Sequence, residues 1–130
     1  MEFEITFTNG AGPADIEMVL SGVPTLAGLR LLNEQLISDL RFRAGMTLLV
    51  DLSALDTSGL SADEVQRLSE PTVERDWFYA PAASAIVAPD DSTYNVARAY
   101  WAHLGGSMSN RQVFRSKAEA IAWLKERSRT

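Results

Sequence analysis

The chain has 130 residues, with 17 Asp and Glu against 12 Lys and Arg, which gives a formal net charge of −5. It contains no cysteine and one histidine, His103, so disulfides, thiolate metal sites, cysteine nucleophiles and paired-histidine metal sites are excluded. The length suits one domain, because domains cluster at roughly 100–150 residues. We therefore expect a single domain over residues 1–130, with no metal, no cofactor and no enzymatic activity.

Charge is unevenly distributed along the chain. Residues 51–91 hold nine acidic and two basic residues, whereas residues 110–130 hold six basic and two acidic residues. The basic end could contact an anionic partner or form a solvated helix face. The acidic balance argues against nucleic acid, because phosphate contacts need clustered Lys and Arg. No stretch reaches the roughly 18–20 apolar residues of a transmembrane segment, and the acidic start differs from a signal peptide, so we expect a cytoplasmic protein.

The first part of the chain predicts a hairpin, a helix and a buried strand. Apolar residues alternate over residues 2–8 and again over 15–21, on either side of a segment rich in turn formers, which predicts an antiparallel hairpin. Leucines then recur every three or four residues over 24–42, which predicts a helix that starts at Pro24. Residues 46–52 are nearly all apolar, as in a strand covered on both faces.

The second part continues to alternate helices and strands. A capping box, Ser61 to Glu64, opens a helix over 61–79, within which Pro71 predicts a kink or two short helices. A buried strand is expected at 84–88, and a helix over 92–104.

A short strand at 111–114 and a helix that begins at a second capping box, 116–119, complete the pattern. The order is therefore β-β-α-β-α-β-α-β-α. It predicts an α/β fold with a mixed, mostly parallel five-stranded sheet, an N-terminal β-hairpin and flanking helices.

A polar loop follows the buried strand and leads into the capped helix. Its residues are Asp56, Thr57, Ser58 and Gly59. Hydroxyls at this place lie near the N–H groups of a helix start, where a phosphate is favoured. The loop is therefore a candidate phosphoacceptor or switch. The alternative is that its side chains only cap the helix.

The residues around this loop resemble a known family. Val-Asp-Leu-Ser-x-Leu at 50–55, followed by Asp-Thr-Ser-Gly-Leu at 56–60, resembles the strand, hydroxyl loop and helix of anti-sigma-factor antagonists, the STAS pattern. In that family the first hydroxyl after the Asp accepts phosphate from a partner kinase. The resemblance implies that Thr57 would be the acceptor and Ser58 its neighbour.

The second half of the chain resembles a narrower group. The segments at 85–91, 97–100, 113–115 and 118–124 are similar to the SpoIIAA-like branch of the STAS/SEC14 group, and the resemblance covers roughly residues 15–127. It implies a STAS/SpoIIAA-like domain that acts as a small interaction or ligand-binding module. Lipid-carrier domains resemble these proteins in fold.

Aromatic residues form a second candidate site. Consecutive aromatics on a helix cannot all face one core, so some must be partly exposed or line a groove. The candidate groove for a ligand or partner consists of Trp77, Phe78, Tyr79, Tyr94 and Trp101. The alternative is packing at the sheet edge.

Acidic residues form a third candidate site. Four acidic residues fall near the carboxyl ends of strands, where open α/β sheets usually place ligands: Asp51, Asp56, Asp90 and Asp91. They could bind magnesium or only cap and solvate the helix starts. His103 is interpreted as a structural residue at a helix end.

We expect first a non-enzymatic regulatory or protein-interaction module that resembles anti-sigma-factor antagonists and binds an unidentified protein partner, with a hydroxyl-loop switch. The alternative is a carrier or sensor of a small apolar, lipid-like ligand held between the sheet and the helix around 77–79. The partner could also be a second copy of this chain, which would make the protein a homodimer. A phosphate- or magnesium-dependent enzyme ranks last.

Overall fold

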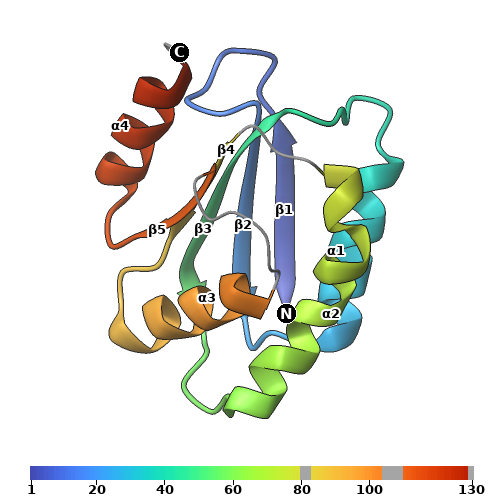
Figure 1. The fold of residues 1–130 in the computed structure, drawn as a ribbon, viewed down its shortest axis with the longest axis vertical. Coiled ribbons are helices and arrows are strands. Elements are labelled where there is room, and N and C mark those ends of the chain that lie inside the picture. The colour runs from blue at the N-terminus through green and yellow to red at the C-terminus, as the bar shows by residue number, and fades with distance from the viewer. Residues whose placement is uncertain (80–82, 104–109, 129–130) are drawn as a thin grey trace.

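The computed structural model describes residues 1–79, 83–103 and 110–128, with the backbone alone for residues 73–79 and 128. Within these described residues, nine elements follow one another in the order that the sequence predicts (Figure 1). They are β1 (Glu2–Phe7), β2 (Ile16–Gly22), α1 (Leu26–Ser38), β3 (Thr47–Leu55), α2 (Ala62–Tyr79), β4 (Ala83–Val87), α3 (Asp91–His103), β5 (Arg111–Phe114) and α4 (Lys117–Ser128).

The five strands form one sheet in the order β1-β2-β3-β4-β5. β1 pairs with β2 in antiparallel fashion, and all other neighbours are parallel. The turn between β1 and β2 uses left-handed backbone at Asn9 (φ 53°) and Gly10 (φ 81°), conformations that Asn and Gly adopt most readily. The predicted mixed α/β sheet with an N-terminal hairpin is therefore confirmed.

The sheet is covered differently on its two faces. Helices α1, α2 and α3 cover one face, and α4 packs on the other face over β3, β4 and β5 (Figure 1). Successive strand residues point to opposite faces, so Leu48 joins the core under α1 while Leu49 joins the core under α4. The first of these two cores holds the candidate site.

Helix α1 is shorter than the leucine spacing predicts. It begins at Leu26, with Thr25 as N-cap, and its C-cap is Asp39 in extended conformation. The carboxylate of Asp39 pairs with Arg41 at 2.8 Å, which stabilises a non-helical turn at this point. Leu40, which the leucine spacing places on the apolar face, is 97% exposed, so this part of the prediction is wrong.

Helix α2 runs without a break from Ala62 to Tyr79 and contains Pro71. The alternative of two short helices is therefore wrong. The predicted capping box is confirmed, because Ser61 N donates to Glu64 Oε1 at 3.1 Å and Glu64 N donates to Ser61 Oγ at 3.2 Å. None of the helices in the described ranges is long and apolar enough to cross a membrane.

Strand β3 is longer than predicted and contains a bulge. Val19 pairs with Asp51, but Ser21 pairs with Ala54, so β3 has one more residue than β2 over this interval. A bulge changes which side chains face inward. Both Leu52 and Leu55 reach the α1 face as a result, although they are three residues apart.

Candidate functional site

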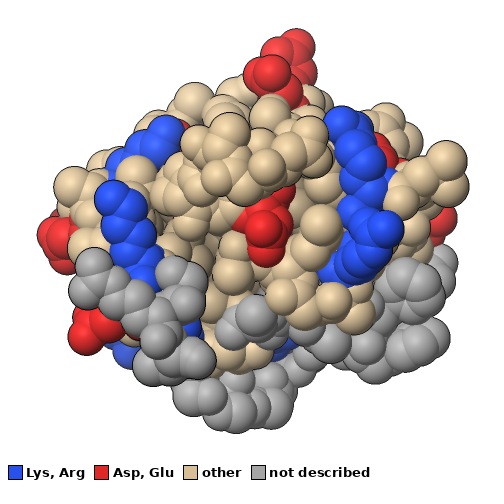
Figure 2. Space-filling model, turned by 90° about the horizontal axis from the view of Figure 1, so that it is seen from above, with Lys and Arg blue, Asp and Glu red and all other residues tan. Residues whose placement is uncertain are grey.

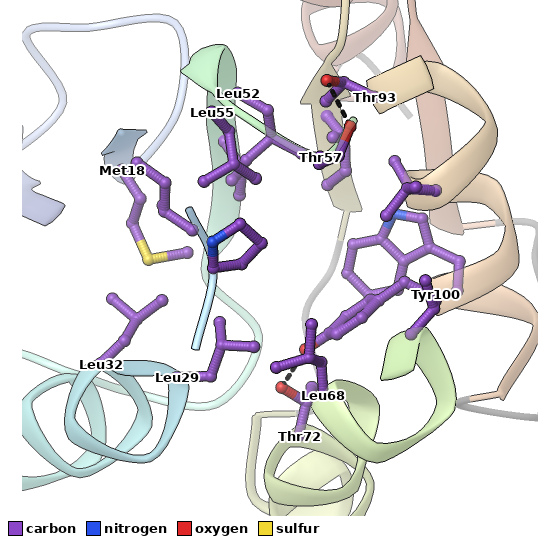
Figure 3. Close-up of a pocket in the computed structure, with 18 of the residues that line it drawn as sticks. Met18, Leu29, Leu32, Leu52, Leu55, Thr57, Leu68, Thr72, Thr93 and Tyr100 are labelled. Atoms are coloured by element: carbon purple, nitrogen blue, oxygen red, sulfur yellow. Dashed lines mark hydrogen bonds between the residues drawn. The ribbon is translucent and has the colours of Figure 1, made fainter. Parts of the chain in front are cut away.

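An apolar cavity of about 150 Å³ lies between the sheet and helices α1, α2 and α3 (Figure 3). β2 and β3 supply its floor through alternate residues, among them Met18 and Leu52. α1 supplies Leu29 and Leu32, which lie three residues apart on one face of that helix. Protein interiors contain few voids larger than one water molecule, so a cavity of this size is a candidate binding site.

The cavity contains a hydroxyl cluster at the carboxyl ends of β3 and β4. Thr57 is 3% exposed, and its Oγ1 lies 2.9 Å from Ser92 Oγ and 3.0 Å from Thr93 Oγ1. Thr93 is 1% exposed, and its backbone N–H donates to the capping carboxylate of Asp90 at 2.7 Å. Thr57 and Thr93 both line the cavity (Figure 3).

The predicted switch loop has one inward and one outward hydroxyl. Thr57 is buried, whereas Asp56, Ser58 and Gly59 are exposed. Asp56 Oδ1 accepts hydrogen bonds from Ser58 Oγ at 2.7 Å and from Ser58 N at 3.1 Å. These two bonds stabilise the carboxylate and lower the pKa of Asp56. The two neighbouring hydroxyls therefore differ in access to solvent.

The described residues of the predicted aromatic groove lie in two places, one in the cavity wall and one outside it. Trp101 lines the cavity, edge-on to Tyr100 with 5.7 Å between ring centroids. Tyr100 is hydrogen-bonded to Thr72 across the cavity wall (Figure 3). Tyr94 is half-buried outside the cavity lining, and the guanidinium carbon of Arg115 lies 4.2 Å from its ring centroid.

The other three aromatic candidates are Trp77, Phe78 and Tyr79. They belong to the last turns of α2, and their side chains lie outside the described residues.

A second polar group lines the cavity near the amino ends of the parallel strands. The register pairs Leu48 with Ser84 and Ser84 with Arg111, so these three side chains form a row on the cavity face. Ser84 is 2% exposed and lines the cavity. Arg111 is 7% exposed, and its guanidinium carbon lies 5.1 Å from the ring centroid of Trp101.

The sequence patterns do not predict Ser84, Arg111 or the leucines as site residues. A hydroxyl inside an otherwise apolar strand and an arginine at the start of a short strand were the available signals. Neither signal shows that the two residues are neighbours, because that depends on the register between β4 and β5.

The acidic candidates each have local partners. Asp51 accepts hydrogen bonds from Ser53, and Asp90 caps α3. Asp91 pairs with Arg115 at 2.5 Å. Among the described residues, no group of three or more His, Asp or Glu side chains could hold a metal ion.

Basic side chains do not merge into a single patch on the face seen from the top of Figure 1. In Figure 2 they form separate groups on opposite sides, with acidic side chains in between. The described part of this face lacks the continuous basic stripe that phosphate backbones contact.

No family model matches the chain, and no curated protein matches it by sequence. Its structure is similar to that of an uncharacterised protein of the DUF3478 family, with a SpoIIAA-like fold, from Shewanella loihica PV-4. The TM-score is 0.59 and the identity 19%, over 95% of this chain and 92% of the other. The fold of this protein is therefore SpoIIAA-like, as the sequence resemblance implies.

Proposed function

We propose that this protein is a non-enzymatic module that holds a small apolar molecule in the cavity between the sheet and helices α1–α3. The observation that supports the proposal is the cavity of about 150 Å³. An engineered cavity of about this volume, lined by Leu, Ile and Phe, binds benzene. A ligand the size of one aromatic ring or a short acyl chain would fit in this cavity.

The energetics of packing support an occupant. A cavity left empty in a protein core costs about 24 cal/mol per Å³, so a cavity of about 150 Å³ corresponds to roughly 3–4 kcal/mol. A ligand that restored this packing would bind with a Kd of low-millimolar order before any polar contact is counted.

Native mass spectrometry of the purified full chain tests this proposal. We expect wild-type protein to carry a small copurified molecule, or to take up 1-hexanol after extraction with organic solvent. Ala97, which lines the cavity, provides a blocking variant, Ala97→Leu. Ala99 on the same helix is exposed, so Ala99→Leu is the matched control.

We expect the control to bind as wild type does and the blocking variant to bind neither molecule. Wild-type protein that is empty and does not take up 1-hexanol would contradict the proposal.

A second candidate function is protein interaction through the loop Asp56–Gly59. It is favoured by the position of this loop, where exposed Ser58 adjoins Thr57 in the cavity wall. A ligand could therefore alter the surface that a protein partner contacts. Phosphate on Thr57 would require the loop to open, because its hydroxyl is buried and bonded to Ser92 and Thr93. Ser58 is the more accessible hydroxyl.

Partner capture with wild-type protein, Ser58→Glu and Thr57→Glu tests the switch. We expect Ser58→Glu to change the captured partner or its affinity, because a negative charge beside Asp56 disturbs the loop. Ser58→Ala is the control for loss of the hydroxyl. Identical partners and affinities for all four proteins would argue against a switch.

A further inference from the structure

The cavity is apolar over most of its wall but has one cationic end. Arg111 lines it and is buried, and Ser84 lies directly beside it across the β4–β5 pair. No Asp or Glu is among the described residues that line the cavity. The described lining therefore favours a negative group over a positive one at this end.

The two side chains at this end are suited to a carboxylate. A guanidinium carries five N–H donors in a planar fork, so it can hold a carboxylate in addition to other partners. The ring of Trp101, 5.1 Å from the guanidinium carbon, restricts where the guanidinium can lie. Ser84 lies beside Arg111 in the strand register and also lines the cavity. Its hydroxyl can donate one hydrogen bond to a ligand oxygen.

We infer that the ligand is a small carboxylate with an apolar body, an inference that rests on the proposed function of the cavity. The carboxylate binds Arg111 and Ser84 near the amino ends of β4 and β5. The body extends between the sheet and α1, toward Met18 and Leu32, which line the same cavity. This apolar body is a ring or a short acyl chain, and both kinds of ligand carry the same carboxylate.

Binding measurements with matched acids and alcohols test this inference. The probes are hexanoate with 1-hexanol and phenylacetate with 2-phenylethanol, added to the full chain and measured by isothermal titration calorimetry. We expect at least one acid to bind about 10- to 100-fold more tightly than its alcohol, which is the range for a hydrogen bond to a charged group. The pair with the larger ratio identifies the body as a chain or a ring.

Two substitutions assign the effect to Arg111. Arg111→Met is expected to reduce the affinity for the acid to that for the alcohol and to leave the alcohol within about threefold. Arg115→Met is the matched control, because Arg115 is exposed and lies outside the cavity lining. We expect this control to leave both affinities unchanged. If Arg111→Met does not fold, two other measurements test the inference. Wild-type protein should bind the acid more tightly than the alcohol, and Ser84→Ala should weaken binding of the acid but not of the alcohol.

The inference and the function on which it rests fail in different ways. Equal affinity of acids and alcohols for wild-type protein would overturn the carboxylate inference and leave the apolar cavity as a binding site. If folded Arg111→Met bound the acids as tightly as wild type does, the carboxylate inference would also be overturned. Failure of all four probes to bind would overturn both.

Discussion

Two adjacent hydroxyls, on Thr57 and Ser58, have opposite surroundings. Thr57 is held between Ser92 and Thr93 inside the molecule, whereas Ser58 is exposed and bonded to Asp56. The family resemblance locates the loop but does not reveal which hydroxyl is buried. Which of the two hydroxyls is buried depends on the bulge in β3. The bulge determines which side chains at the end of this strand face the cavity, and the loop follows directly.

Thr57→Val should destabilise the protein by about 1–2 kcal/mol, because it keeps the side-chain shape but removes the hydrogen-bond partner of the buried Thr93 hydroxyl. Urea unfolding measures the change. Ser58→Ala, at an exposed position, should remain within about 0.5 kcal/mol of wild type. Equal stability of Thr57→Val and wild type would show that these hydroxyl contacts contribute nothing.

Ser58→Ala should raise the pKa of Asp56 toward its ordinary value, because the Ser58 hydroxyl is the largest cause of the lowered pKa. A lowered folded-state pKa stabilises the protein above the unfolded pKa of about 3.9, and this contribution is lost as pH falls through the folded pKa. NMR titration of the Asp56 carboxyl measures the shift, with Glu64 as an internal control. An unchanged pKa would contradict the assigned hydrogen bond.

At the scale of elements, periodicity and capping residues predict most of the chain. The alternation of apolar and polar residues predicts the hairpin, and the capping box at Ser61 predicts the start of α2. The end of α1 could not be predicted, because leucine spacing continues to Leu40 while the Asp39–Arg41 pair favours a turn. The bulge in β3 also lacks a sequence signal, since it follows from the register with β2.

Ser61→Ala should destabilise the protein by about 1 kcal/mol, because α2 loses the hydroxyl that accepts from Glu64 N. Thermal or urea unfolding provides the measurement. Ser61→Thr, which keeps a capping hydroxyl, is the control and should lose only a few tenths of a kcal/mol. If Ser61→Thr and Ser61→Ala are equally destabilised, the cap is not the cause.

At the scale of the whole molecule, the sequence predicts the sheet and its helices but not the cavity. An empty volume arises from how side chains of three helices and four strands fit together. Helical spacing identifies Leu29 and Leu32 as core residues, and alternation does the same for Met18. Neither pattern shows that the packed residues leave space between them.

Ala97→Leu should fill part of the cavity and stabilise the ligand-free protein by about 1 kcal/mol, because added methyl groups occupy space that is otherwise empty. Urea unfolding of extracted protein measures the change. Ala99→Leu, on the exposed side of α3, should change stability by less than about 0.5 kcal/mol. Destabilisation by Ala97→Leu alone would indicate a well-packed site rather than a cavity.

The most direct measurement is an NMR titration of methyl groups in the extracted full chain with 1-hexanol. If a small apolar molecule occupies the cavity, saturable shifts should appear at the methyls of Leu29, Leu32 and Ile86, which line it. The methyls of Leu124, in the core under α4, should stay unchanged, and Ala97→Leu should abolish the shifts. Shifts that do not saturate, or that are equal in the two cores, would contradict binding in the cavity.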